Sequence, residues 1–240
     1  MSDTADGPAG GLELRLRLPG ETVPLDQVVI AVVSLVARVD VVDVNARLNL
    51  IEGDLSVIVT GPDRVPVRCG WPWPVDSAPR SVALSAGQML IAAVPLVASR
   101  ASAPLFAVPG AYVVDAAFDT GRGVIAAPAV RLVRTAPTDA ARADALRDRD
   151  ALQSLLAGGV LGDGRRAVEV LAASDDPATA AMADIALGRV VTDRGDAGAL
   201  AVAAVLPPGA TGADDRRDAA RDGASAEVLT AFDGTPSSAG

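Results

Sequence analysis

The chain has no histidine and no lysine, and it has a single cysteine. Without histidine it lacks the usual general base near neutral pH, the Ser-His and Cys-His nucleophile pairs, and the commonest zinc ligand. Without lysine it lacks the phosphate-binding lysine of P-loops and the amine that forms Schiff bases. We therefore expect a protein that is not an enzyme, with no catalytic residues and no cofactor.

The missing residues do not exclude functions that use aspartate and glutamate. These functions are glycosidase-type hydrolysis and the binding of a hard cation. The adjacent pairs Asp175-Asp176 and Asp214-Asp215 each precede a helical pattern, where a carboxylate accepts hydrogen bonds from free N–H groups. The segment Asp163-Gly164 lacks the alternating carboxylates of a calcium loop. The sequence thus predicts no metal site, and a carboxylate-based hydrolase is the enzymatic alternative.

The single thiol, Cys69, cannot form a disulfide within the chain. No histidine or lysine lies beside it to lower its pKa, so we expect an inert, small hydrophobic residue. The first residues lack the cationic and apolar segments of a secretory signal. Together these features predict a cytoplasmic protein.

Charge and hydropathy restrict the partners. The net charge is -9, and every cation is an arginine dispersed among acidic residues, which argues against binding to nucleic acid. The largely apolar run from Val28 to Ala37 is too short to span a membrane and is bounded by Asp26 and Arg38. We therefore expect a protein partner, and no membrane.

The first half of the chain has the alternation of β-strands. From Leu12 to Leu18 every second residue is leucine, and Glu13, Arg15 and Arg17 lie between, as in an edge strand with one solvated face. Further strands are expected at Val28 to Val39, Val41 to Leu50, Leu55 to Thr60, Val65 to Arg68, Ser81 to Leu84 passing into Met89 to Val97, Ala111 to Phe118 and Val124 to Val133. Short strands separated by glycine, proline and aspartate turns predict an antiparallel sandwich of about seven strands.

Two segments indicate the type of sandwich. Ser81 to Gly87 and then Phe106 to Phe118, with Tyr112 just after Pro109-Gly110, have the pattern of the closing hairpin of an immunoglobulin-like β-sandwich. We expect structural roles for the aromatic residues here. Tyr112 should donate a hydrogen bond to the backbone from a partly buried position, and Phe106 and Phe118 should lie in the core.

The chain resembles bacterial immunoglobulin-like β-sandwich modules, including those similar to the intracellular proteinase-inhibitor domain. The resemblance covers Leu12 to Arg134 and is carried by the turn Leu84-Ser-Ala-Gly87, Phe106, and Pro109-Gly-Ala-Tyr112. It implies the sandwich fold and, through the inhibitor modules, inhibition of a protease. The family's leucine, arginine, asparagine and small-residue element after the second strand is here Leu35-Val-Ala-Arg38-Val.

The composition changes at Thr135-Ala-Pro137, and the sequence beyond it predicts helices. The expected helices are one with Ala141, Ala145, Leu152 and Leu156 along a single stripe up to Gly158-Gly159, one capped by Asp163 and running through Ala173, one from Asp176-Pro177 to about Asp193, one from Ala197 to Leu206, and one from Asp214 to Phe232. We divide the chain into a flexible leader at 1–11, a sandwich at 12–134, an α-helical region at 138–206, and a linker, amphipathic helix and disordered tail at 207–240. The helices are either packed on the sandwich or separate from it.

A binding surface is predicted at Trp71 and Trp73, which Pro72 and Pro74 hold in a stiff segment. Such a pair suits a protein hot spot or stacking on a sugar, and Arg68 would add a polar contact. The alternative is that one or both rings close an open end of the sandwich. We therefore expect a protein-interaction or assembly module of unknown oligomeric state. The alternatives are a protease inhibitor and a carbohydrate-binding protein that uses the two tryptophans.

Overall fold

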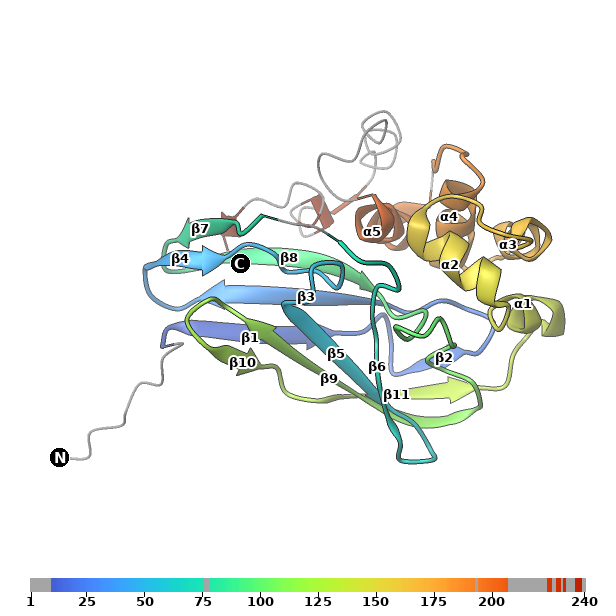
Figure 1. Cartoon of the computed structure of the whole chain (residues 1–240), viewed down its shortest axis with the longest axis horizontal. Coiled ribbons are helices and arrows are strands. Elements are labelled where there is room, and N and C mark those ends of the chain that lie inside the picture. Colours follow the sequence, from blue (N-terminus) through green and yellow to red (C-terminus); the bar gives the residue numbers. More distant parts are fainter. Residues whose placement is uncertain are drawn as a thin grey trace.

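The computed structural model describes residues 10–75, 78–192, 194–206, 224–225, 228–229, 231 and 236–238. A β-rich region comes first and a group of helices follows it (Figure 1). None of the helices in the described ranges has the length and apolar character needed to cross a bilayer. The predicted β-sandwich followed by an α-helical region is confirmed.

Two main sheets form the β region. The first has the order β1-β3-β8-β12, with β1 (Leu12–Arg17), β3 (Ile30–Ala37), β8 (Gln88–Pro95) and β12 (Ser237–Ser238). The second has the order β2-β11-β9-β5-β6, with β2 (Thr22–Pro24), β11 (Val130–Thr135), β9 (Gly110–Asp119), β5 (Leu55–Thr60) and β6 (Pro66–Arg68), and β10 (Val124–Ala126) pairs with β9. A small sheet joins β4 (Val41–Asn45) to β7 (Ser81–Leu84). All pairs are antiparallel except β2 with β11.

The sandwich core lies between the two main sheets. Leu14 and Leu35 contribute from the first sheet, and Val57, Phe118 and Leu132 contribute from the second. Buried and more exposed residues alternate along β9, as they do in a strand with one face toward a core. The expected edge position of the leucine-rich strand is also confirmed, because among the described strands β1 pairs with β3 alone.

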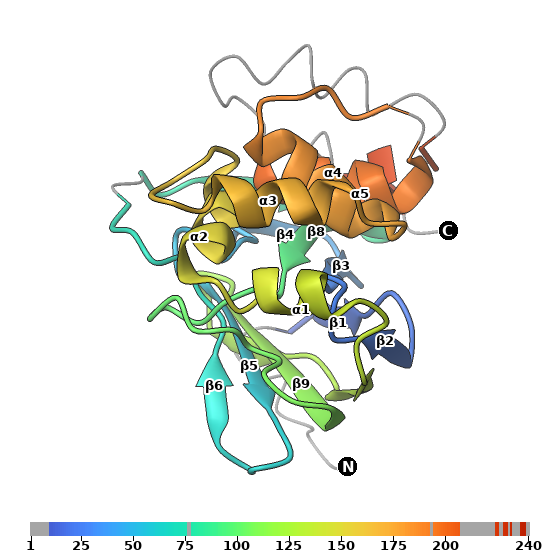
Figure 2. The same ribbon diagram turned by 90° about the vertical axis from the view of Figure 1, so that its right-hand side faces the viewer.

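The helices gather at one end of the β region (Figures 1 and 2). They are α1 (Ala140–Ala145), α2 (Arg149–Ala157), α3 (Arg165–Ala172), α4 (Pro177–Ala186) and α5 (Gly195–Val205). Helix α5 lies across the outer face of the first sheet over β8 and β3. Their apolar cluster contains Leu155, Met182 and Val202 together with Val28 and Ile30 of the sandwich. Strand β3 is thus buried on both faces, which explains why its sequence is almost continuously apolar. The helices are packed on the sandwich.

A buried carboxylate joins the two parts. Asp26 accepts hydrogen bonds from the backbone N–H of Thr138 at 2.8 Å, from the Thr138 hydroxyl at 2.7 Å and from the N–H of Asp139 at 3.2 Å. Burial raises the pKa of this carboxyl, but the hydrogen bonds outweigh burial and hold the pKa below its ordinary value. A second tie is the N–H of Val28, which donates to the Thr179 hydroxyl at 2.9 Å.

The closing hairpin predicted for Ser81 to Phe118 is wrong. Strand β8 pairs with β3, whereas β9 pairs with β5 and β11 in the opposite sheet. The connection between β8 and β9 therefore crosses from one sheet to the other. The expected continuation of Ser81–Leu84 into the next strand is also wrong, because β7 pairs with β4 in the small sheet.

The helix boundaries differ from the prediction in three places. The expected single helix is divided into α1 and α2, because Asp148 accepts a hydrogen bond from the N–H of Ala151 and begins a new helix. Asp163 does not cap α3, which begins after Gly164 without a side-chain cap. Helix α4 ends at Ala186, well before Asp193, although Asp176 caps it as expected. Most of the helix expected at Asp214 to Phe232, and most of the leader, lie outside the described residues.

Candidate binding groove

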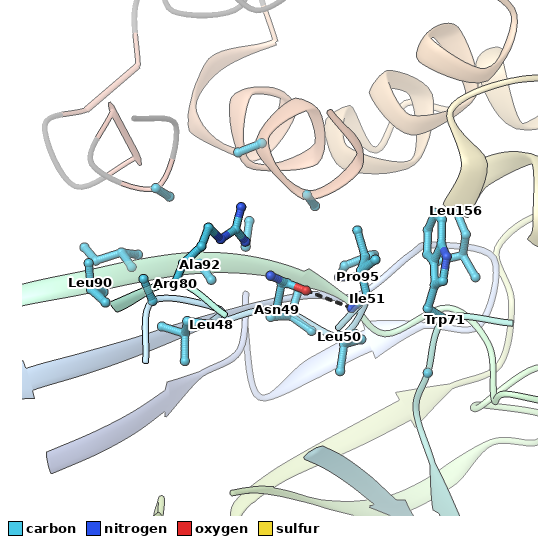
Figure 3. A pocket seen from close by; sticks show the side chains of 18 residues that line it. Leu48, Asn49, Leu50, Ile51, Trp71, Arg80, Leu90, Ala92, Pro95 and Leu156 are labelled. Carbon is cyan, nitrogen blue, oxygen red and sulfur yellow. Dashed lines mark hydrogen bonds between the residues drawn. The ribbon is translucent and has the colours of Figure 1, made fainter. Parts of the chain in front are cut away.

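A groove with a volume of about 290 Å³ runs beside strand β8 (Figure 3). Residues Leu90 to Pro95 of β8 form its floor, Ala46 and residues 48–51 after β4 line one side, and Ala203 and Ala204 of α5 line the other. Trp71 and Leu156 lie together at one end. Most of the lining side chains are apolar, so the groove can remove apolar groups of a ligand from water.

The groove exists because β8 lies near the edge of its sheet. In the described residues only β12 pairs with the outer edge of β8, and it reaches no further than Gln88 and Met89. Helix α5 crosses β8 and β3, and the residues with which it lines the groove are alanines. Their short side chains leave open the space that longer ones would fill.

The polar residues at the groove form a fixed cluster. The Asn49 side-chain carbonyl accepts hydrogen bonds from the N–H groups of Ile51 at 2.9 Å and Glu52 at 3.1 Å. The Asn49 amide donates to a Glu52 carboxylate oxygen at 2.7 Å, and Arg80 donates to the same carboxylate at 2.9 and 3.1 Å. The Arg80 side chain is 59% exposed. These contacts hold the loop in place and leave part of the guanidinium open to a ligand.

The two tryptophans occupy different places. Their ring centroids are 4.8 Å apart and the planes meet at 69°, an edge-to-face contact. Both rings are partly buried against the helical cluster rather than at an end of the sandwich core. Trp71 lines the groove, whereas Trp73 packs behind it and is not among the lining residues.

The structure places Arg68 away from the groove. It lies on β6, exposed, with its guanidinium 3.5 Å from the Gly53 carbonyl oxygen. The arginine at the groove is Arg80, which sequence reasoning missed. No local motif marks Arg80 or Ala204, since the groove joins segments that are far apart in the chain.

Two other aromatic residues, the buried Tyr112 and the partly buried Phe106, pack together at the sandwich core. The Tyr112 hydroxyl donates to the Val108 carbonyl at 2.7 Å, and its ring meets Phe106 edge-to-face at 5.1 Å. The Arg134 guanidinium lies 4.8 Å from the Phe106 ring centroid and donates to the Gln27 carbonyl at 2.8 Å. Burial lowers the pKa of Arg134 to about 10, so the group stays cationic at neutral pH. Phe118 is fully buried.

Few reactive groups are seen in the described part of the chain. Cys69 is buried, and desolvation raises the pKa of its thiol to about 12, which leaves it protonated near neutral pH. Among the residues described, no three acidic or cysteine side chains gather as metal ligands would.

No protein-family model matches the chain, and no curated protein is detectably similar to it. Among solved structures, a sporulation control protein from Bacillus subtilis, Spo0M, matches with a TM-score of 0.32 and 11% sequence identity. The match covers 57% of this chain and 54% of that protein, about half of its length. A match at this level does not bear on what the groove binds.

Proposed function

We propose that the protein is a non-enzymatic interaction module that binds an apolar segment of a partner protein in the groove. The observation that carries the proposal is the groove itself, which is open, mostly apolar and fitted with a few fixed polar groups. Concave, mostly apolar sites with a few placed polar groups are where proteins usually bind ligands, and apolar grooves are one of the sites that receive peptide segments. Trp71 at its end and Arg80 at its margin are residue types that contribute strongly to protein interfaces.

The two alternatives from the sequence have less support. A sugar-binding platform favours tryptophan faces that are open to the ligand, whereas Trp71 and Trp73 meet at 69° and pack against the helices. The resemblance to intracellular proteinase-inhibitor modules would require a projecting rigid loop that enters a protease active site. The feature that stands out here is concave, so it fits a receiver of a segment better. Assays against a panel of proteases test the inhibitor alternative directly.

A peptide library panned on the full chain tests the proposal. Selected peptides should bind the wild type, and Ala204→Arg should weaken binding at least tenfold because a long cationic side chain would occupy the groove. Arginine is tolerated near the end of α5 by helix propensity and by the helix dipole. Ala141→Arg, the same change at an exposed position on α1, is the matched control and should leave binding unchanged.

Calorimetry on purified variants gives the affinities, and thermal unfolding confirms that both variants fold. The proposal fails if no library peptide binds the wild type. It also fails if the peptides bind wild type and Ala204→Arg equally well.

A further inference from the structure

The outer edge of β8 opens into the groove. The N–H of Leu96 donates to the Val29 carbonyl, at 2.8 Å, on the side of β3. Hydrogen-bonding direction alternates along an antiparallel strand, so Leu90, Ala92 and Val94 direct their N–H and C=O groups toward β3. Ile91 and Ala93 direct theirs toward the opposite edge, and in the described residues no strand pairs with them there.

This edge already accepts an extended chain. Ser237 pairs with Met89 and Ser238 pairs with Gln88, both in antiparallel register. The pairing is only two residues long, which is a weak addition to a sheet. Pro236 precedes it and lies on the side of Leu90, because the antiparallel direction runs the chain that way. The groove continues along β8 from the point where this pairing ends.

We infer that the partner segment binds as an added β-strand on the outer edge of β8, and that it competes with β12 for the beginning of that edge. The inference rests on the proposed function and defines the chemistry of the partner. A strand added here would lie between the alanines of α5 on one face and Leu48 and Leu50 on the other.

The partner strand is therefore expected to be apolar on both faces. Apolar side chains should face α5, where the short side chains of Ala203, Ala204 and Ala231 leave space for them. Apolar side chains should also face Leu48 and Leu50 of the loop. Proline should be absent from the paired residues, because it has no N–H to donate to β8.

Backbone methylation of a selected peptide tests the strand geometry. Each peptide N–H is replaced in turn by N–CH₃, and the affinity for the full chain is measured by calorimetry. We expect losses of more than tenfold at every second residue, whose N–H groups face β8, and changes of less than twofold at the residues between. In ¹⁵N-labelled protein, the amides of Ile91 and Ala93 should become protected from hydrogen exchange when the peptide binds, while Ala92 stays protected throughout.

Changes in β12 test the competition. Deletion of Pro236 to Gly240, or Ser237→Pro, should tighten peptide binding by about fivefold, since the hydrogen bonds of a two-residue pair contribute little. Ser237→Ala keeps the backbone N–H and should leave the affinity unchanged. Weaker binding after the deletion would overturn the competition.

The two proposals fail in different ways. Peptides that bind in the groove with no two-residue period in the methylation series, and with no change at Ile91 and Ala93, overturn strand addition while the proposed function stands. Failure of every peptide to bind the full chain overturns both.

Discussion

Replacing Asp26 with alanine removes the carboxylate that joins the sandwich to α1. Its side chain is 1% exposed and accepts three hydrogen bonds from Thr138 and Asp139. It also lies 3.5 Å from the Arg142 guanidinium. In the variant, two backbone N–H groups and the Thr138 hydroxyl lose their acceptor. The partly buried Arg142 guanidinium loses one of its two carboxylate partners, and no new group replaces the one removed. We therefore expect the free energy of unfolding to fall substantially.

The magnitude follows from these contacts. A hydrogen bond to a charged group contributes about 1.5–3 kcal/mol, and the three are not additive because they share one carboxylate. The contact with the partly buried Arg142 adds less than the roughly 3–5 kcal/mol that breaking a fully buried ion pair costs. We expect a loss of about 4 kcal/mol, which for a protein of this size corresponds to a fall in Tm of roughly 8–16 °C.

Urea denaturation, followed by circular dichroism and tryptophan fluorescence, measures the loss at pH 7. The matched control is Asp144→Ala, because Asp144 lies on α1, the helix that Asp26 joins to the sandwich, and its side chain is 79% exposed and pairs with Arg147. An exposed pair of this kind contributes less than about 1 kcal/mol. A loss for Asp26→Ala no larger than that of the control would refute the reasoning.

The pH dependence has a defined sign. The pKa of the Asp26 carboxyl is lower in the folded protein than in the unfolded chain. Its stabilising contribution is therefore complete above about pH 4, the range in which unfolded aspartate ionises, and is lost as the pH falls through the lower folded pKa. The stability difference between wild type and Asp26→Asn should stay constant from neutral pH to about pH 5 and shrink below it. A difference that grows on acidification would contradict this assignment.

Three further changes test the packing. Tyr112→Phe removes the hydroxyl that donates to a backbone carbonyl at 2.7 Å and should cost about 1 kcal/mol in urea denaturation; no measurable loss would mean that the bond is absent in solution. Cys69, whose thiol pKa burial raises to about 12, should not react with a thiol reagent at pH 8 until the protein is unfolded, and rapid labelling of the native protein would contradict its burial. Gly158→Ala should destabilise the protein by about 1–2 kcal/mol, because Gly158 has a φ of +63° and an added Cβ would come within 2.8 Å of a side chain of α5. The control is Gly159→Ala, which should change stability little because an added Cβ there would meet no atom within 4 Å.

Most strand positions were predictable from the sequence, but the pairing of the strands was not. Strand β2 was not expected, and the single strand expected at Val124 to Val133 is divided into β10 and β11. The alternation from Leu55 to Thr60 predicts β5 with the same bounds. In a strand with one buried face every second side chain points to the core, so apolar residues recur at every second position. The same periodicity does not say which sheet a strand joins. The region from Ser81 to Phe118 was therefore assigned to one hairpin, although its strands lie in three different sheets.

The ends of the helices were also only partly predictable from the sequence. Gly158 ends α2 as predicted, since its left-handed conformation is one that glycine adopts without strain. The break between α1 and α2 was missed because alanine and leucine continue the apolar stripe across it. The cap formed by Asp148 overrides that stripe, and a cap within a charged segment has no distinctive signature.

Of the candidate site, the sequence identified one residue at the groove. Trp71 was found because a tryptophan between prolines is conspicuous by itself. Arg80 and Ala204 were not, because each acquires a role only when β8, α5 and residues 46–51 come together. Arg68 is close to Trp71 only in sequence, and in the fold β6 places it near Gly53, away from the groove.

The two edges of the first sheet differ in the charged residues that protect them. This difference supports a binding role for the edge formed by β8. An exposed edge strand is a hazard, and proteins usually protect it with charged side chains or a covering segment. Strand β1 follows this rule, because Glu13, Arg15 and Arg17 lie along it. Strand β8 has no charged residue between Gln88 and Pro95, and only the two residues of β12 pair with its outer edge in the described part of the chain. An uncharged, apolar edge that opens into a groove favours pairing with another strand. The lack of charged residues along β8 is therefore what we expect if a partner strand binds there.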